Sequence, residues 1–166
     1  MAQQPTHSGE LPQATSARES TYREIHDLLC RFYQAFDTHD WPLLGECIAD
    51  RVRTDYTSFR GTPEAVVDRE HYVLLRRTAL STLRMQHNFS NLRIITNNGQ
   101  IQGRCNYMIY RFAPDTETHA GSYFHSFGHY IFDFELHAQG WQISGITQCL
   151  LINQGDSTLH TGNMRS

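Results

Sequence analysis

The hydrophobic pattern in the N-terminal third of the chain is that of one amphipathic helix. Large apolar side chains recur at spacings of three and four over Tyr22–Phe36, the period of a helix with one buried face. Ser20 or Thr21 can cap its start, and we expect it to end near Asp37. Residues 1–19 are rich in Gln, Pro, Ser and Thr, so the sequence predicts a flexible N-terminal tail there.

Two further helices and a short strand are predicted next. Asp40 can cap a short helix, in whose first turn Pro42 is tolerated. Residues 51–59 read as a short strand. Thr62 is then expected to cap a third helix, with Pro63 at the first helical position.

The second half of the chain alternates in the manner of long β-strands. The expected strands are about 83–96, 100–113, 121–138 and 141–153, joined by the turn signals Asn97-Asn98-Gly99 and Gln139-Gly140. Three helices followed by long hairpins predict an α+β fold, a curved antiparallel sheet with helices on one face. Such a sheet can bend around a cavity. The polar residues 154–166 are expected to form a loose C-terminal tail.

Composition narrows the class of protein. A chain of 166 residues with 39% hydrophobic residues is long enough for one domain with its own core. The net charge of −3 and the lack of clustered Lys and Arg argue against nucleic acid as a partner. No signal-peptide pattern and no apolar run of about 18 residues are present, so no membrane association is expected. Four isolated cysteines without a CxxC pair favour reduced thiols in a cytoplasmic protein.

Candidate acid–base residues are spread over separate predicted elements. Asp37 ends the first helix, Tyr56 lies on the first strand, His87 follows the third helix, and His125 and His129 share a later strand. A carboxylate at a helix C-terminus is unfavourable to the helix, which suggests another reason for Asp37. Together these residues indicate an acid–base pocket with a histidine of near-neutral pKa.

Other kinds of site have less support. His125, His129 and either Asp133 or His137 alternate along one strand and could ligate a metal, but bulky aromatic residues interrupt the run, so we expect no metal site. Neither a Rossmann nor a P-loop fingerprint occurs, and the expected chemistry requires no cofactor.

Four segments carry a resemblance to a known family. They are Phe36–Leu44 (FDTHDWPLL), Asp55–Phe59 (DYTSF), Met85–His87 (MQH), and Gly128-His129 ahead of Gly140-Trp141. In order and spacing they resemble the scytalone dehydratase-like, or SnoaL-like, members of the nuclear-transport-factor-2-like superfamily. The resemblance implies a cone-shaped α+β fold over about residues 20–153.

The resemblance also implies residue roles. His87 would be the general acid and base, and Asp37 would pair with His129 on the later strand. Tyr56 would hold a water against the substrate carbonyl. The family has a second tyrosine where this chain has Phe36, so one hydroxyl group is missing.

The later strand leaves one assignment open. His125 and His129 point to the same side of a regular strand, so either could pair with Asp37, and the Gly-His match favours His129. Phe36, His125 and Phe127 are expected to contact the substrate.

Two functions are compatible with these observations. The first is a cofactor-independent dehydratase or isomerase of secondary metabolism, acting on a cyclic hydroxy-ketone or a related polyketide- or terpenoid-derived small molecule. The alternative is a non-catalytic ligand-binding or structural module, such as a dioxygenase small subunit, because one fold can host both. Apolar residues on both faces of the long strands predict a homodimer or homotrimer formed through the open sheet face.

Overall fold

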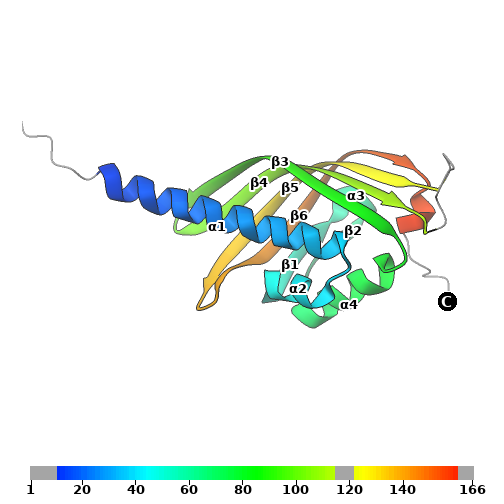
Figure 1. Cartoon of the computed structure of the whole chain (residues 1–166), viewed down its shortest axis with the longest axis horizontal. Coiled ribbons are helices and arrows are strands. Elements are labelled where there is room, and N and C mark those ends of the chain that lie inside the picture. Colours follow the sequence, from blue (N-terminus) through cyan, green and yellow to red (C-terminus); the bar gives the residue numbers. More distant parts are fainter. Residues whose placement is uncertain (1–10, 115–121, 161–166) are drawn as a thin grey trace, which may run out of the picture.

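A computed structural model describes residues 11–114 and 122–160 as helices around a curved sheet (Figure 1). The helices are α1 (Leu11–Asp37), α2 (Trp41–Cys47), α3 (Thr57–Arg60) and α4 (Arg69–Leu80), with a 3-10 helix at Ser157–His160. The strands are β1 (Ile48–Tyr56), β2 (Thr62–Asp68), β3 (Arg84–Asn97), β4 (Gln100–Phe112), β5 (Phe124–His137) and β6 (Gly140–Gly155). The predicted α+β class is confirmed.

The six strands form one sheet in the order β2-β1-β6-β5-β4-β3. All neighbours are antiparallel except β1 and β6, which run parallel, so the sheet is mixed rather than purely antiparallel as predicted. The parallel pair arises because the chain crosses the whole sheet between β1 and β6. The α1 helix lies along the concave face of the sheet in Figure 1.

Three local predictions are confirmed. The α1 helix ends at Asp37, and Asp40 caps α2 by accepting a hydrogen bond from the Leu43 N–H at 3.0 Å. The β3–β4 hairpin turns at Asn98-Gly99, whose φ angles of 49° and 80° are those of the left-handed region that a two-residue hairpin requires.

The predicted start of the first helix is wrong. The α1 helix begins at Leu11, so residues 11–19 are helical rather than a flexible tail, and residues 1–10 lie outside the described part of the chain. Side-chain pairs one turn apart support this extension. Arg23 contacts Glu19 at 2.6 Å, and the Ser20 hydroxyl donates to Glu24 at 2.7 Å.

The predicted third helix also starts in the wrong place. Thr62–Asp68 forms the edge strand β2, and the helix begins only at Arg69. The β-branched pair Val66 and Val67 favours a strand, and Pro63 is tolerated at its start because β2 is an edge. The strand β2 pairs with β1, where Val67 lies opposite Val52.

Smaller differences concern the other strand ends. The strand predicted at 51–59 ends at Tyr56, and Thr57–Arg60 form one helical turn. At the C-terminal end β6 extends to Gly155 and a 3-10 turn follows, so residues 154–160 are more ordered than the predicted tail. Residues 161–166 lie outside the described part of the chain.

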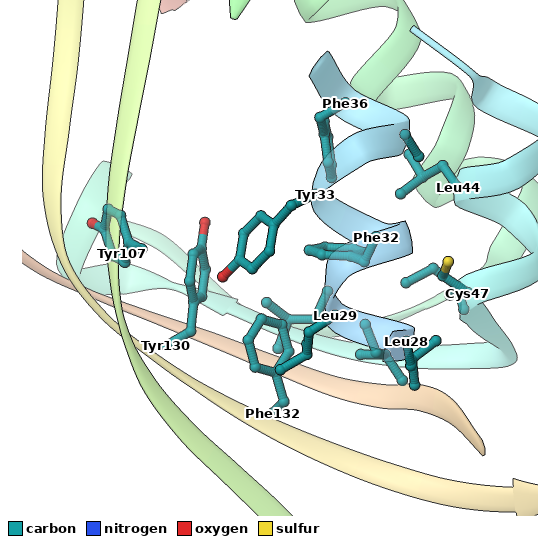
Figure 2. Close-up of a cluster of buried hydrophobic side chains, with 14 of the residues drawn as sticks. Leu28, Leu29, Phe32, Tyr33, Phe36, Leu44, Cys47, Tyr107, Tyr130 and Phe132 are labelled. Atoms are coloured by element: carbon teal, nitrogen blue, oxygen red, sulfur yellow. The ribbon is translucent and has the colours of Figure 1, made fainter. Parts of the chain in front are cut away.

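The core lies between α1 and the concave face of the sheet. Figure 2 shows Phe32 and Tyr33 of α1 pointing toward Tyr130 and Phe132 of β5. The Phe32 and Phe132 rings meet edge to face with centroids 5.8 Å apart. This packing fixes the height of α1 above the sheet, and with it the position of Asp37 at the helix end.

Candidate active site

A small cavity lies in the core beside the C-terminal end of α1. Its volume is about 30 Å³, room for roughly two water molecules, so side chains fill most of the deep pocket that the sequence predicts. Most of the lining is aromatic or aliphatic. The polar members that matter for chemistry are Tyr56, Arg60, Arg76, His87, Arg111 and Gln148.

Asp37 and His87 form the closest polar pair at this cavity. The His87 Nδ1 atom lies 2.6 Å from the Asp37 Oδ1 atom, and the His87 side chain is only 5% exposed. The backbone N–H of His87 also donates to both carboxylate oxygens of Asp37 at 3.0 Å. Asp37 therefore fixes the ring and the backbone of His87 together.

The contact with Asp37 determines which nitrogen of His87 can react. Because a carboxylate accepts hydrogen bonds, Nδ1 carries the proton and Nε2 is left to accept one. Burial lowers the pKa of His87 below its ordinary 6.5, although the hydrogen bond to Asp37 opposes the shift. His87 is therefore neutral at neutral pH, in the form that a general base needs.

Aromatic rings hold the His87 ring in place. The Tyr33 ring stacks on it with centroids 5.8 Å apart, and the Phe36 ring lies 5.2 Å from it. Phe36 and Tyr56, both named as site residues from the sequence, line the cavity. The Tyr56 hydroxyl lies 3.5 Å from the Tyr72 hydroxyl, at the limit of a hydrogen bond.

The predicted pairing of Asp37 with His129 is wrong, and so is the alternative with His125. Both histidines lie on the outer face of β5. The residues of this strand that point inward are Phe124, Ser126, Tyr130, Phe132 and Phe134. His129 lies 3.2 Å from the Arg104 guanidinium instead.

His125 and Phe127, which were expected to contact the substrate, lie away from the cavity. The His125 ring packs among Tyr110, Phe112 and Tyr123, and the Phe127 ring meets Tyr110 at 6.1 Å. Neither lines the cavity, so the expectation that they contact the substrate is not met. The Gly-His match could not reveal this, because it fixes the residue and not the face of the strand.

Sequence reasoning missed the three arginines of the cavity. Arg111 is 3% exposed and Arg76 is 8% exposed, while Arg60 is exposed at the rim. A signal was present for Arg111, which continues the inward alternation of Tyr107 and Ile109 along β4.

Within residues 11–114 and 122–160, no three His, Cys, Asp or Glu side chains gather closely enough to hold a metal ion. In the same part of the chain, no helix is both long and apolar enough to cross a membrane.

Several solved structures share this fold. The chain is similar to Kfla4162 from Kribbella flavida, with a TM-score of 0.79 and 17% identity over 87% of this chain and 99% of the other. It is similar to a hexachlorocyclohexane dehydrochlorinase, LinA type 2, with a TM-score of 0.70 and 14% identity over 92% and 99% of the two chains. It is also similar to a provisionally named scytalone dehydratase from Novosphingobium aromaticivorans, with a TM-score of 0.68 and 12% identity over 86% and 91%.

A curved, unclosed mixed sheet wrapped around α1 defines the class as a nuclear-transport-factor-2-like cone fold. Residues 17–147 match the SnoaL-like domain, and the chain belongs to that family. No curated protein matches the chain.

Proposed function

We propose that this protein is a cofactor-independent lyase or isomerase whose Asp37–His87 pair moves a proton to and from carbon. The observation that carries the proposal is the 2.6 Å contact that fixes a buried, neutral histidine at the cavity. The substrate class that suits this chemistry is a cyclic hydroxy-ketone, or a related polyketide- or terpenoid-derived small molecule of secondary metabolism.

Dehydration would proceed through an enolate. The Nε2 atom of His87 takes the proton from the carbon next to the carbonyl, and the electrons of that C–H bond form the enolate. The enolate electrons then form the carbon–carbon double bond as the β-hydroxyl leaves. His87 returns its proton to this hydroxyl, which departs as water. Returning the proton to carbon instead gives isomerisation.

The charge changes in this sequence suit the neighbours of His87. Asp37 stabilises the imidazolium that forms when His87 accepts the proton. The hydroxyl of Tyr56, which lines the same cavity, can donate a hydrogen bond to the negatively charged enolate oxygen. Little water can enter a cavity of about 30 Å³, which strengthens both interactions.

The named neighbours support elimination as the reaction type. One is called a dehydratase, a name for an enzyme that removes water, and another a dehydrochlorinase, a name for an enzyme that removes hydrogen chloride. Structural similarity at such low sequence identity establishes a shared fold and no more. The proposal therefore depends on Asp37 and His87.

A ring-sized substrate requires the cavity to widen. Arg60 lies at the rim on α3, stacked over the Tyr56 and Phe59 rings with its guanidinium carbon 5.3 Å and 5.2 Å from their centroids. It is exposed, and so is Gly61 after it, which adopts a φ of 68°. This short turn is the segment that we expect to move when a substrate enters.

The test is proton exchange with a panel of cyclic hydroxy-ketones. Hydroxytetralones incubated in D2O should gain deuterium next to the carbonyl and lose water to give naphthols, both followed by NMR. His87→Ala should slow both by at least about 100-fold while the protein stays folded. Ligands that bind tightly without exchange would replace this proposal with the ligand-carrier alternative.

A further inference from the structure

Three guanidinium groups meet at the cavity without a carboxylate. Within the described residues, neither Arg60, Arg76 nor Arg111 lies within 4.0 Å of an Asp or Glu oxygen. The one acidic side chain nearby, Asp37, is engaged by His87. The cavity therefore carries a net positive charge.

Some arginines away from the cavity form ion pairs with carboxylates. Arg53 reaches Glu64 at 3.0 Å and Asp133 at 2.5 Å, and Arg69 reaches Asp50 at 2.7 Å. These pairs are all more exposed than Arg76 and Arg111. Arg76 and Arg111 therefore lack a carboxylate partner at positions where burial makes an unpaired charge most costly.

Arg111 and Gln148 present unused donors inside the protein. The Nη1 atom of Arg111 donates to the Ser126 hydroxyl at 2.8 Å, which fixes the guanidinium, but its Nε atom is buried without a protein partner. The Nε2 atom of Gln148, a residue 2% exposed, is buried without one as well. Both residues line the cavity.

The Arg76 guanidinium lies over two aromatic rings. Its guanidinium carbon lies 4.7 Å from the Tyr56 centroid and 4.8 Å from the Tyr72 centroid. A planar guanidinium fixed in this way is suited to a planar anion, because its donors form a fork that matches a carboxylate. Burial lowers the pKa of Arg111 to about 10, yet it stays charged at neutral pH.

We propose that the cavity binds a carboxylate-bearing cyclic compound, with the carboxylate on Arg111 and Arg76 and the ring against the aromatic wall. This inference rests on the proposed function only for the placement of the reacting carbon at His87. The binding of the anion needs only the arginines. A carboxylate supplies the negative charge that the arginines lack.

Benzoate and its neutral isostere benzamide are the probes. Titration calorimetry at low salt should show saturable binding of benzoate to the full chain, weakened by added salt. Arg111→Met should weaken benzoate by at least about 10-fold, in line with the loss of a charge-assisted hydrogen bond. Benzamide should bind at least about 10-fold more weakly than benzoate to the wild type.

The control is Arg104→Met. Arg104 lies on the same strand as Arg111 but on its outer face, where it contacts His129, so this variant should bind benzoate as the wild type does. Arg76→Met, which removes the other arginine assigned to the carboxylate, repeats the test if Arg111→Met does not fold. Equal binding of benzoate and benzamide, or unchanged binding by the arginine variants, would overturn the inference.

Proton exchange and benzoate binding, measured on the same proteins, separate this inference from the catalytic proposal. Benzoate binding without any proton exchange by the wild type would sink the catalytic proposal alone. Proton exchange that is unaffected by Arg111→Met, with no benzoate binding, would sink the anion site alone.

Discussion

At the scale of single residues, Asp37 is the point where folding and chemistry meet. It ends α1, where a carboxylate opposes the helix dipole, yet it accepts hydrogen bonds from the backbone and the ring of His87. The energetic cost at the helix end is offset by these charge-assisted bonds. One side chain thereby joins α1 to β3 and sets the tautomer of His87.

Asp37→Asn should therefore lower the rate of proton transfer by about 100-fold, because a neutral amide no longer stabilises the protonated ring of His87. The amide oxygen can still accept from the backbone, so we expect the variant to fold. Deuterium exchange on hydroxytetralones measures the rate. Asp27→Asn is the matched control, since Asp27 sits near His26 on the same helix at 3.8 Å but is 82% exposed. An active Asp37→Asn variant would remove Asp37 from the mechanism.

The lowered pKa of His87 predicts a pH profile. The base must be neutral, so kcat/KM should rise through a pKa below 6.5 and then stay level toward neutral pH. The free energy of unfolding should also depend on the protonation of His87. Because the folded pKa is below the unfolded one, unfolding takes up a proton between the two values, and stability falls as pH drops below about 6.5.

Thermal unfolding of the wild type and His87→Gln between pH 5 and 7.5 isolates this contribution from the other histidines. The wild type should lose more stability than the variant as pH falls below about 6.5, since only the wild type carries the buried imidazole. Parallel curves for the two proteins would show that His87 does not titrate as described.

At the scale of elements, the turn between α1 and α2 positions the Asp37–His87 pair. The Asp40 side chain caps α2, and its backbone N–H donates to the Ala35 carbonyl at 2.9 Å, so the chain reverses directly after Asp37. Asp40→Ala should cost about 0.5–2 kcal/mol of unfolding free energy, the usual loss for an N-cap. Urea denaturation measures it. Asp40→Asn keeps the acceptor and should cost less than half as much; equal losses would mean that the cap contributes nothing.

Elements with strong local signals were predictable from the sequence. The end of α1, the cap of α2 and the Asn98-Gly99 hairpin follow from residue types whose preferences are set within a few positions. The strand β2 was not predictable, because Thr62 and Pro63 also suit the start of a helix. Its strand conformation depends on pairing with β1, which no local pattern reveals.

The candidate site was predictable only in part, for the same reason. Asp37, His87 and Tyr56 were found because each stands in a recognisable segment. Their grouping depended on which face of each strand turns inward, and here His129 was misplaced. The arginine cluster joins α3, α4 and β4, so it exists only in three dimensions.

At the scale of the whole molecule, the sheet has one face that the helices leave open. Inward residues of β5 such as Phe132 are fully buried against α1, whereas the opposite face carries Met108 and Ile152 at 38% and 49% exposure. Half-buried aromatic rings, including Tyr110 and Phe127, lie on the same face. An apolar surface of this kind is expected to be covered in the working protein.

We expect a second copy of the chain to cover it, as a homodimer or homotrimer, because a broad sheet face can supply the roughly 800 Å² per partner that stable association requires. Light scattering at micromolar concentration should give a multiple of 19.2 kDa. Ile152→Glu, which places a charge in this face, should shift the protein toward the monomer. Leu74→Glu on α4, where Leu74 is 58% exposed, is the control and should not. A monomeric wild type would contradict the prediction that a second copy of the chain covers the outer face.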